Sequence, residues 1–498
     1  MPPSRPNILF ICSDQHTARI TGAYGDRVVR TPNLDALAGA GCRFDSNYCN
    51  VPVCVASRAS FMTGRHAHKT EVLENAGILD SRIPTLAHMA VRGGYHAVLC
   101  GKMHFLGGDQ LHGFLERPIG EFGGAAPSDG LPTGKLGNCS HHAPLQFTGA
   151  GGNALEDYDA AVAEESVNWL RAYAAAAGAD TPPFFMTVGF LLPHCPYIAS
   201  RPAYDRYDGK VRAPRLAPAQ LEALHPHHRA YRQWIKLEEI PEANFDRAAV
   251  AYYALTDTLD CHVGHLLDTL RATGLWENTI VVYFSDHGEM LGQHGRWHKD
   301  SFFEDSARVP LIVRHPKMEL STAVARPTSL VDLMPTLCEW IGIASPPGLD
   351  GHSLVPLLRG ETQPERTAVK VESYTFWEGE PWSLNSNRMV RRDQWKLNCY
   401  GFTNTYELYD LARDPGEMRD LASCPEHRDI MNQLIPLLFE DGWSRHVASA
   451  WLAKMDAMGA FENYQQYTQL ARKDPLPKDP NYRWSGAGRA RTWLEENA

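Results

Sequence analysis

Short runs of apolar residues alternate along most of the chain with segments whose apolar residues recur every three or four positions. The continuous runs predict buried strands, at residues 7–12, 96–100, 184–190 and 279–284. The periodic segments predict helices, at residues 33–38 and, most clearly, 245–270. Strands that alternate with helices are typical of an α/β fold, so we expect a large, mostly parallel sheet sandwiched by helices.

The pattern changes towards the C-terminus. A Pro- and Gly-rich stretch between residues 345 and 365 is followed by strand-like pieces separated by turns, at residues 368–374, 387–400 and 406–411. We therefore predict a large domain over residues 1–365 and a smaller α+β subdomain over residues 366–498, with an antiparallel sheet and terminal helices. Within the first, the Gly-, Pro- and His-rich composition of residues 120–155 and 200–243 predicts two long loops.

Charge and cysteine usage exclude several classes of protein. The chain has 48 Lys and Arg against 58 Asp and Glu, a net charge of -10, which disfavours a nucleic-acid partner. Its 11 cysteines are scattered without CxxC pairs, as expected for reduced thiols. The apolar runs at residues 8–12 and 184–192 are too short for a signal peptide or a membrane span. We expect a soluble cytoplasmic protein with no membrane partner.

Polar side chains follow each of the four predicted strands. These side chains are Asp14 after the first strand, Lys102 and His104 after the second, His194 after the third, and Asp286 and His287 after the fourth. Ligand sites in open α/β sheets lie beyond the carboxyl ends of the strands. Any one of these residues could belong to an ordinary solvated turn, but their recurrence at four strand ends favours a site.

The types of side chain at these strand ends suit a cation and an anion. Asp14 and Asp286 would repel each other unless a divalent cation lay between them, and His287 could be a third ligand. Arg58, Lys102 and Lys299 would add positive charge that suits an anionic substrate. The alternative is that these cationic residues form surface ion pairs, as most Lys and Arg do.

The segment Cys54-Val55-Ala56-Ser57-Arg58 provides a family resemblance. It resembles the signature of type I sulfatases of the alkaline-phosphatase superfamily, in which a maturation enzyme oxidises the cysteine to formylglycine. Further segments fall where that family has comparable ones, at residues 64–65, 101–104, 286–289, 294–295, 308–311 and 407–417. Within the family, residues 101–105, 109–114 and 297–308 and Asn75 are similar to the choline-sulfatase branch.

This resemblance implies an alkaline-phosphatase-like fold and a metal-assisted nucleophile. The nucleophile would be hydrated formylglycine at position 54, which attacks sulfur and thereby hydrolyses the sulfate ester of a small organic, aryl or carbohydrate alcohol. Asp14, Asp286, His287 and residue 54 would surround one divalent metal, with calcium expected from most relatives and manganese favoured by the imidazole ligand. The implied partners are a small anionic sulfate ester, a formylglycine-generating enzyme and further copies of the chain, in a homo-oligomer.

The resemblance also implies roles for the surrounding side chains. Arg58, Lys102, His194 and Lys299 would hold the sulfate oxygens, and His194 or Lys299 would protonate the leaving alcohol. His104 would take a proton as residue 54 releases sulfate, and Asn75 would contact the substrate. An aromatic and acidic cage for a choline-like group could be built from Phe376, Trp377, Glu378, Glu380 and Trp382.

Two positions differ from the common family pattern. Position 13 is Ser where many sulfatases have a second metal-binding Asp, and this resembles the choline-sulfatase and phosphonate-hydrolase branches. Position 56 is Ala where Pro is usual in the maturation motif. Two alternatives therefore stay open: hydrolysis of phosphonate monoesters or phosphodiesters, and a non-catalytic binding protein in which Cys54 remains a thiol.

The remaining histidines and tryptophans receive ordinary structural interpretations. We expect His141, His142, His225, His227 and His228 to lie in exposed loops. Trp340, Trp443, Trp451 and Trp484 are expected in the core or at subunit contacts.

Overall fold

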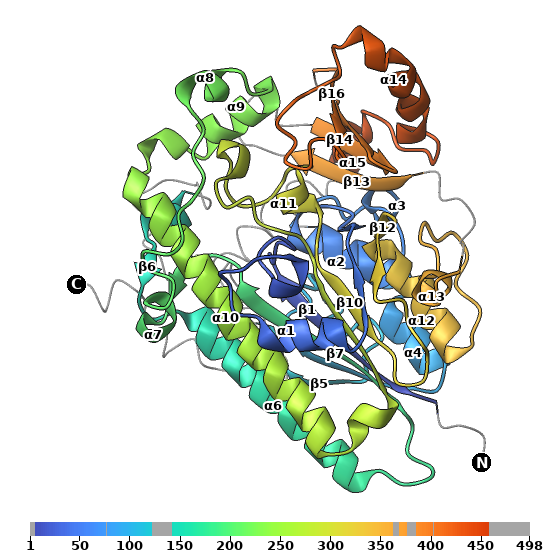
Figure 1. Ribbon diagram of the computed structural model, residues 1–498. Coiled ribbons are helices and arrows are strands. Elements are labelled where there is room, and N and C mark those ends of the chain that lie inside the picture. The colour runs from blue at the N-terminus through green and yellow to red at the C-terminus, as the bar shows by residue number, and fades with distance from the viewer. Residues whose placement is uncertain are drawn as a thin grey trace.

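The computed structural model describes residues 5–75, 77–121, 142–361, 368–375, 385–401 and 403–457. Its centre is an eight-stranded sheet with the order β11-β2-β10-β9-β1-β7-β4-β5 (Figure 1). In that order the strands span Ala323–Val324, Cys42–Phe44, Leu311–Arg314, Thr279–Ser285, Asn7–Asp14, Phe184–Pro193, His96–Gly101 and Glu116–Ile119. The strands from β9 to β5 are mutually parallel, and β10 runs antiparallel to β9. The predicted large, mostly parallel sheet is confirmed.

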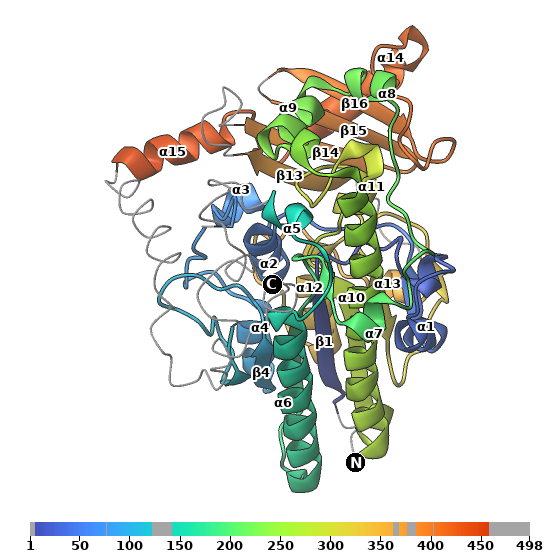
Figure 2. The ribbon, with the colours of Figure 1, turned by 90° about the vertical axis from the view of Figure 1, so that its left-hand side faces the viewer.

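Helices cover both faces of this sheet. Along β1, Leu9 and Ile11 belong to the core on one face, and Ile8 and Phe10 belong to the core on the other. The first face is covered by α1 (Pro32–Gly39), α6 (Ala154–Ala176) and α10 (Glu242–Ala272), and the second by α2 (Cys54–Thr63), α4 (Leu86–Arg92) and α12 (Leu333–Ile341). Figure 2 shows α6 and α10 side by side along the first face. Burial on both faces explains why these strands are continuous apolar runs.

A second sheet is built by the C-terminal part of the chain. Four antiparallel strands follow one another in sequence order: β13 (Val369–Thr375), β14 (Asn385–Arg392), β15 (Trp395–Tyr400) and β16 (Thr405–Asp410). They are followed by α14 (Arg428–Leu434) and α15 (Val447–Ala457). Figure 1 shows this sheet at one end of the molecule, beside α3 (Ala67–Thr70) and α11 (Glu304–Ala307). The antiparallel sheet is confirmed, while the domain boundary at residue 365 stays a prediction.

The predicted loops contain more regular structure than their composition indicates. Residues 200–243 include three short helices, α7 (Arg201–Tyr204), α8 (Pro218–Glu222) and α9 (Pro226–Trp234). The last part of residues 120–155 includes α5 (Ala143–Gln146), β6 (Gly149–Ala150) and the start of α6, and residues 122–141 lie outside the described residues. Pro at the first helical position favours the start of α8 and of α9, a signal that the loop interpretation overlooked.

The exposed positions predicted for several histidines are wrong. His227 and His228 are buried, because α9 packs on the C-terminal sheet and brings both rings against Tyr400. His225 is half-buried and stacks on the same tyrosine ring. His142 is also buried, with its Nδ1 atom 3.2 Å from the carbonyl oxygen of Ile235. A contact between residues far apart in the sequence explains each of these burials.

Other predictions of burial and pairing can be compared directly. Trp443 and Trp451 are buried and Trp340 is half-buried, whereas Trp484 and residues 376–384 lie outside the described residues. The ten cysteines in the described part of the chain are all unpaired thiols. Among the helices that the structure describes, none combines the length and the apolar character needed to cross a bilayer.

Candidate active site

The helix α2 places Cys54 at the carboxyl end of the central sheet. Val53 is extended, α2 begins at Cys54, and it ends at Gly64, whose φ of 69° lies in the left-handed region that favours glycine. All ten residues of the helix are buried. The first side chain of α2 therefore occupies a fixed position, facing the residues that follow β1 and β9.

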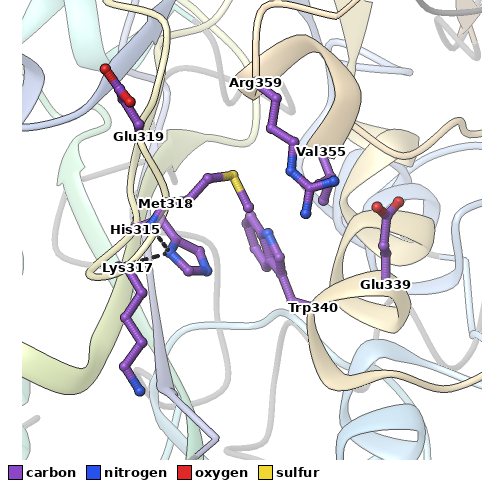
Figure 3. A pocket seen from close by; sticks show the side chains of 8 residues that line it. All are labelled: His315, Lys317, Met318, Glu319, Glu339, Trp340, Val355 and Arg359. Carbon is purple, nitrogen blue, oxygen red and sulfur yellow. Dashed lines mark hydrogen bonds between the residues drawn. The ribbon is translucent and has the colours of Figure 1, made fainter. Parts of the chain in front are cut away.

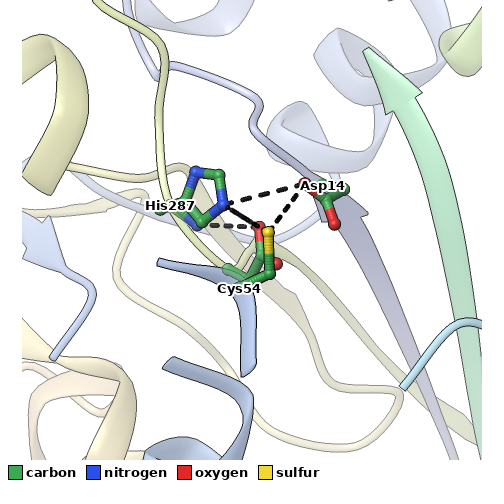
Figure 4. A group of neighbouring side chains, drawn as sticks. Asp14, Cys54 and His287 are labelled. Atoms are coloured by element: carbon green, nitrogen blue, oxygen red, sulfur yellow. Dashed lines mark hydrogen bonds and ion pairs between the residues drawn. The ribbon is translucent and has the colours of Figure 1, made fainter. Parts of the chain in front are cut away.

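Four side chains converge at this point. Ligand atoms of Asp14, Cys54, Asp286 and His287 all lie within 4.8 Å of one another, and all four residues are buried. Cys54 Sγ lies 3.1 Å from His287 Nε2 and 3.7 Å from Asp14 Oδ1 (Figure 4). The two aspartates are neighbours because β1 and β9 pair in register, with Ser13 opposite Ser285. The convergence predicted from the strand ends is confirmed.

Arg58 joins the two aspartates from one turn further along α2. Its Nε atom donates to Asp286 Oδ2 at 2.9 Å, and its Nη2 atom donates to Asp14 Oδ2 at 3.1 Å. Burial raises the pKa of Asp286, and Asp14 adds to this rise while Arg58 opposes it. Burial also disfavours ionisation of Asp14, but the positive charges of Lys102, His194 and Arg58 lower its pKa. The ionised form of Asp14 is thus stabilised by the surrounding cationic side chains.

These donor atoms fit a divalent cation. Two carboxylates and one imidazole nitrogen lie together, and His287 Nε2 is 3.7 Å from an oxygen of each aspartate. Carboxylate oxygens and a neutral imidazole suit calcium, manganese and related ions. The residues present therefore could hold a metal, with residue 54 as the fourth member of the group.

Two lysines and a histidine lie close to Cys54 and Asp14. Lys102 Nζ lies 2.5 Å from Asp14 Oδ2, and Lys299 Nζ lies 3.3 Å from Cys54 Sγ and 2.8 Å from His194 Nε2. Burial alone would raise the pKa of the Cys54 thiol, but Lys299, Lys102 and His287 lower it well below its usual value of 9.0. The site thus stabilises negative charge at residue 54 and on any anion bound beside it.

His104 and Asn75 approach Cys54 from other directions. His104 helps to lower the pKa of the Cys54 thiol and has a φ of 61°, a strained conformation for a residue other than glycine. Asn75 Oδ1 accepts a hydrogen bond from the backbone N–H of Val55 at 3.0 Å, at the start of α2. This contact stabilises the helix terminus, so contact of Asn75 with substrate stays a prediction.

Three further side chains support the site, two of them buried and Glu121 half-buried, and the sequence analysis did not single them out. Gln15, with a φ of 65°, donates its backbone N–H to Asp286 and accepts a hydrogen bond from Lys299 Nζ at 2.8 Å. Glu121 accepts the backbone N–H groups of Met103 and His104, and Asp159 accepts those of Leu191 and Leu192. Gln15 could have been found from its place after β1, but the other two come from distant segments without a motif.

A cavity of about 600 Å³ lies at a different place in the fold. It is lined by His315, Trp340, Arg359 and neighbouring residues (Figure 3). Arg314 pairs with Val281 near the start of β9, so His315 lies towards the end of the sheet opposite Asp286. The cavity shares no residue with the cluster around Cys54 and is therefore not the site described above.

Comparison with known proteins decides the family. The profile of the family described as Sulfatase matches residues 6–343, and that of the N-sulphoglucosamine sulphohydrolase C-terminal region matches residues 292–441. The chain belongs to the sulfatase family. A choline-sulfatase of Rhizobium meliloti (strain 1021) is 34% identical over 500 residues, which cover 97% of this chain and 94% of that protein. This sulfatase is therefore a sulfuric ester hydrolase.

Solved structures agree with this fold. A 2-O GAG sulfatase is 26% identical with a TM-score of 0.67, covering 96% of each chain. A phosphonate monoester hydrolase of Agrobacterium radiobacter is 24% identical with a TM-score of 0.71, covering 96% of this chain and all of that one. The second likeness concerns the fold alone. The sulfatase shares its architecture with both enzymes, and the phosphonate hydrolase alternative gains no further support.

Proposed function

We propose that this sulfatase hydrolyses sulfate esters with a formylglycine made from Cys54 as its nucleophile. The observation that carries the proposal is the convergence of Asp14, Cys54, Asp286 and His287 on one buried point. Conversion would place a hydrated aldehyde, with two hydroxyl groups on one carbon, where the thiol now lies. A divalent cation held by the other three residues would act as a Lewis acid and lower the pKa of a hydroxyl group at that point.

The side chains around residue 54 divide the remaining chemistry between them. Lys102 and Lys299 flank Cys54 and would bind the sulfate oxygens, where negative charge develops during hydrolysis. Arg58 forms ion pairs with both aspartates, which holds them in place, and it adds a third positive charge to the site. These groups are fixed before substrate binds, because the three cationic side chains are buried and each has at least one defined partner.

Two imidazoles are suited to proton transfer. His194 Nε2 lies 2.8 Å from Lys299 Nζ, and burial together with Lys299 lowers the pKa of His194. We assign protonation of the leaving alcohol oxygen to this pair, either from the His194 imidazole or from the Lys299 ammonium group. His104, which helps to lower the pKa of residue 54, would accept a proton from it when sulfate is released.

We propose a small organic, aryl or carbohydrate alcohol as the leaving group. The range is supported by relatives whose names are choline-sulfatase, arylsulfatase K and 2-O GAG sulfatase. Asn75 is proposed to contact this part of the substrate, since its side chain lies at the start of α2 beside the nucleophile. The proposed ion is calcium, with manganese as the alternative that the His287 imidazole supports.

We also propose a maturation partner, a cellular compartment, an oligomeric state and a domain division for the enzyme. A formylglycine-generating enzyme would act on Cys54, and the ten unpaired cysteines of the described residues support a reducing, cytoplasmic compartment. A homo-oligomer is expected, and its mass in solution can be measured directly. The domain division at residue 365 would make the first part catalytic and the second a supporting subdomain.

Mass spectrometry of the active enzyme tests the nucleophile. The peptide that contains residue 54 should carry an aldehyde and react with a hydrazide probe, and Cys54→Ala should abolish both labelling and turnover. A fully active enzyme with an unmodified thiol would contradict the proposal.

Rates on a nitrophenyl sulfate and a nitrophenyl phenylphosphonate distinguish the two ester classes. Titration of metal-free enzyme with calcium and with manganese identifies the ion that restores activity.

A further inference from the structure

A buried glutamate outside the groups already assigned lies at the junction of the three central strands. Glu289 is wholly inaccessible to solvent, and it follows β9 by only a few residues. Its neighbours come from the segments that follow β1, β7 and β9, which are adjacent in the sheet. A carboxylate buried so completely needs several hydrogen-bond donors, and their identity indicates what the group does.

Four groups donate hydrogen bonds to the Glu289 carboxylate. Oε1 accepts the backbone N–H groups of Leu291 and His298, each at 2.8 Å. Oε2 accepts the hydroxyl of Tyr197 at 2.8 Å and the side-chain amide N–H of Gln15. A carboxylate offers about four acceptor positions, so these four donors use its capacity fully.

This arrangement fixes which way the Gln15 amide points. Because its nitrogen donates to Glu289, its oxygen must face the other way, where it accepts a hydrogen bond from Lys299 Nζ at 2.8 Å. The hydrogen bond that the backbone N–H of His298 donates to Glu289 also holds the residue next to Lys299. Glu289 thus constrains Lys299 twice, through the side chain of Gln15 and through the backbone.

We infer that Glu289 is a positioning residue for Lys299, and that it acts through the orientation of the Gln15 amide. Its hydrogen bonds lead to Lys299 through the Gln15 side chain and through the backbone next to Lys299, and in the described part of the chain none of them joins Glu289 directly to residue 54 or to the two aspartates. The inference rests on the proposed role of Lys299 in binding sulfate and assisting the leaving group. The inference predicts that full turnover needs both acceptor oxygens of Glu289, and that a side chain of the same size with one acceptor oxygen does not suffice.

The variant Glu289→Gln tests this requirement with almost no change in size. A glutamine offers one acceptor oxygen, so its amide N–H group would face two donors and the Gln15 amide would turn. We expect kcat to fall about 10–100-fold with KM little changed, as for other residues that orient an active-site group. The loss should be larger for an alkyl sulfate than for a nitrophenyl sulfate, because only the poor leaving group needs protonation. A smaller folded fraction would lower both rates equally.

A double-mutant cycle separates positioning from general support. In a Lys299→Ala background, Glu289→Gln should cause no further loss of kcat, since the group that it positions is gone. Independent, multiplicative losses would overturn the inference. If Lys299→Ala itself leaves the rate unchanged, the proposed role of Lys299 fails instead, and the two failures are therefore distinguishable.

A crystal structure of Glu289→Gln provides a readout that does not depend on activity. The inference requires a turned Gln15 amide and a Lys299 ammonium group displaced from residue 54, and unchanged positions of both would overturn it. Asp260→Asn is the matched control. Asp260 is buried on α10 and accepts the backbone N–H groups of Asn33 and Leu34 at the start of α1. That variant should lower stability without changing the ratio of rates for the two leaving groups.

Discussion

Two buried arginines, Arg58 and Arg388, each bridge a pair of carboxylates, yet their surroundings differ. Arg58 binds Asp14 and Asp286 beneath the active site. Arg388, on β14, lies 3.1 Å from Glu372 and 2.6 Å from Asp441, between the C-terminal sheet and the rest of the protein. Both arginines are almost completely buried. Because the two arginines are alike in burial and in partners, the two networks differ mainly in what else binds their carboxylate oxygens.

Around Arg388 the carboxylates are satisfied by the chain itself. Glu372 also binds His68 and the hydroxyl of Tyr374, and Asp441 also binds Lys370. Around Arg58, by contrast, oxygens of both aspartates face His287 and residue 54. The carboxylates around Arg388 thus belong to a closed structural network. The two aspartates around Arg58, which also bind Lys102 and Gln15, form an open network, because they share a possible metal-ligand set with His287 and residue 54. A second group of side chains that could hold a metal ion consists of His66, Asp350 and Asp441. It belongs to the closed type, because Lys69 pairs with Asp350 and Arg388 pairs with Asp441.

Replacement of Arg58 should have the largest effect. Arg58→Met leaves Asp14 and Asp286 buried without their bridging cation and removes one of the three positive charges around residue 54. We expect kcat/KM to fall by at least about 10²–10³-fold and the free energy of unfolding to fall by about 3–5 kcal/mol. Steady-state kinetics and urea unfolding measure the two quantities. Near-normal turnover by Arg58→Met would show that the two networks do not differ in function.

Arg388→Met is the matched change in the closed network. It exposes Glu372 and Asp441 to the same loss of a buried partner, so the free energy of unfolding should again fall by about 3–5 kcal/mol. Because the contacts of Arg388 with described residues do not reach residue 54, kcat per folded molecule should be unchanged. Hydrazide labelling counts the matured molecules, and urea unfolding measures the folded fraction. A large fall in kcat after this correction would contradict a purely structural role.

The sequence predicted the open network better than the closed one. Asp14, Asp286 and His287 each follow an apolar strand, and the carboxyl ends of neighbouring parallel strands must meet, so their convergence followed from local patterns. Glu372, Arg388 and Asp441 lie on two strands and a distant turn of a sheet whose packing partner could not be recognised from periodicity. The burial of His227 and His228 escaped prediction for the same reason. Lys299 and Cys54 required the family signature, since neither follows directly after a strand.

The closed network also predicts how stability depends on pH. Burial disfavours the charged form of Glu372, but the charges of His68 and Arg388 outweigh it and lower the pKa of Glu372 to about 2. Since the folded pKa lies below the unfolded value of 4.5, stability should be lost as the pH falls from about 4.5 to about 2, by up to about 3 kcal/mol. Burial opposes protonation of His68, yet Glu372 raises the pKa of this imidazole above 6.5. The stability contributed by protonated His68 is therefore lost as the pH rises above about 6.5. Unfolding measured between pH 2 and 8 should therefore show a plateau at about pH 4.5–6.5, and the acid limb should be shallower in Glu372→Gln. An unchanged acid limb would contradict this origin.

The smallest effect is expected where an ion pair is neither buried nor shared. Lys454 on α15 binds Glu71, and the two side chains are 48% and 51% exposed. Water already solvates both charges well, and ordering two long side chains costs entropy. The coupling energy in a Lys454→Met and Glu71→Gln double-mutant cycle should therefore be below about 1 kcal/mol. It should be smaller still in 1 M salt, which screens the two charges. Urea unfolding of the four proteins measures it. A coupling as large as the loss of about 3–5 kcal/mol expected for Arg388→Met would show that burial does not decide the strength of these ion pairs.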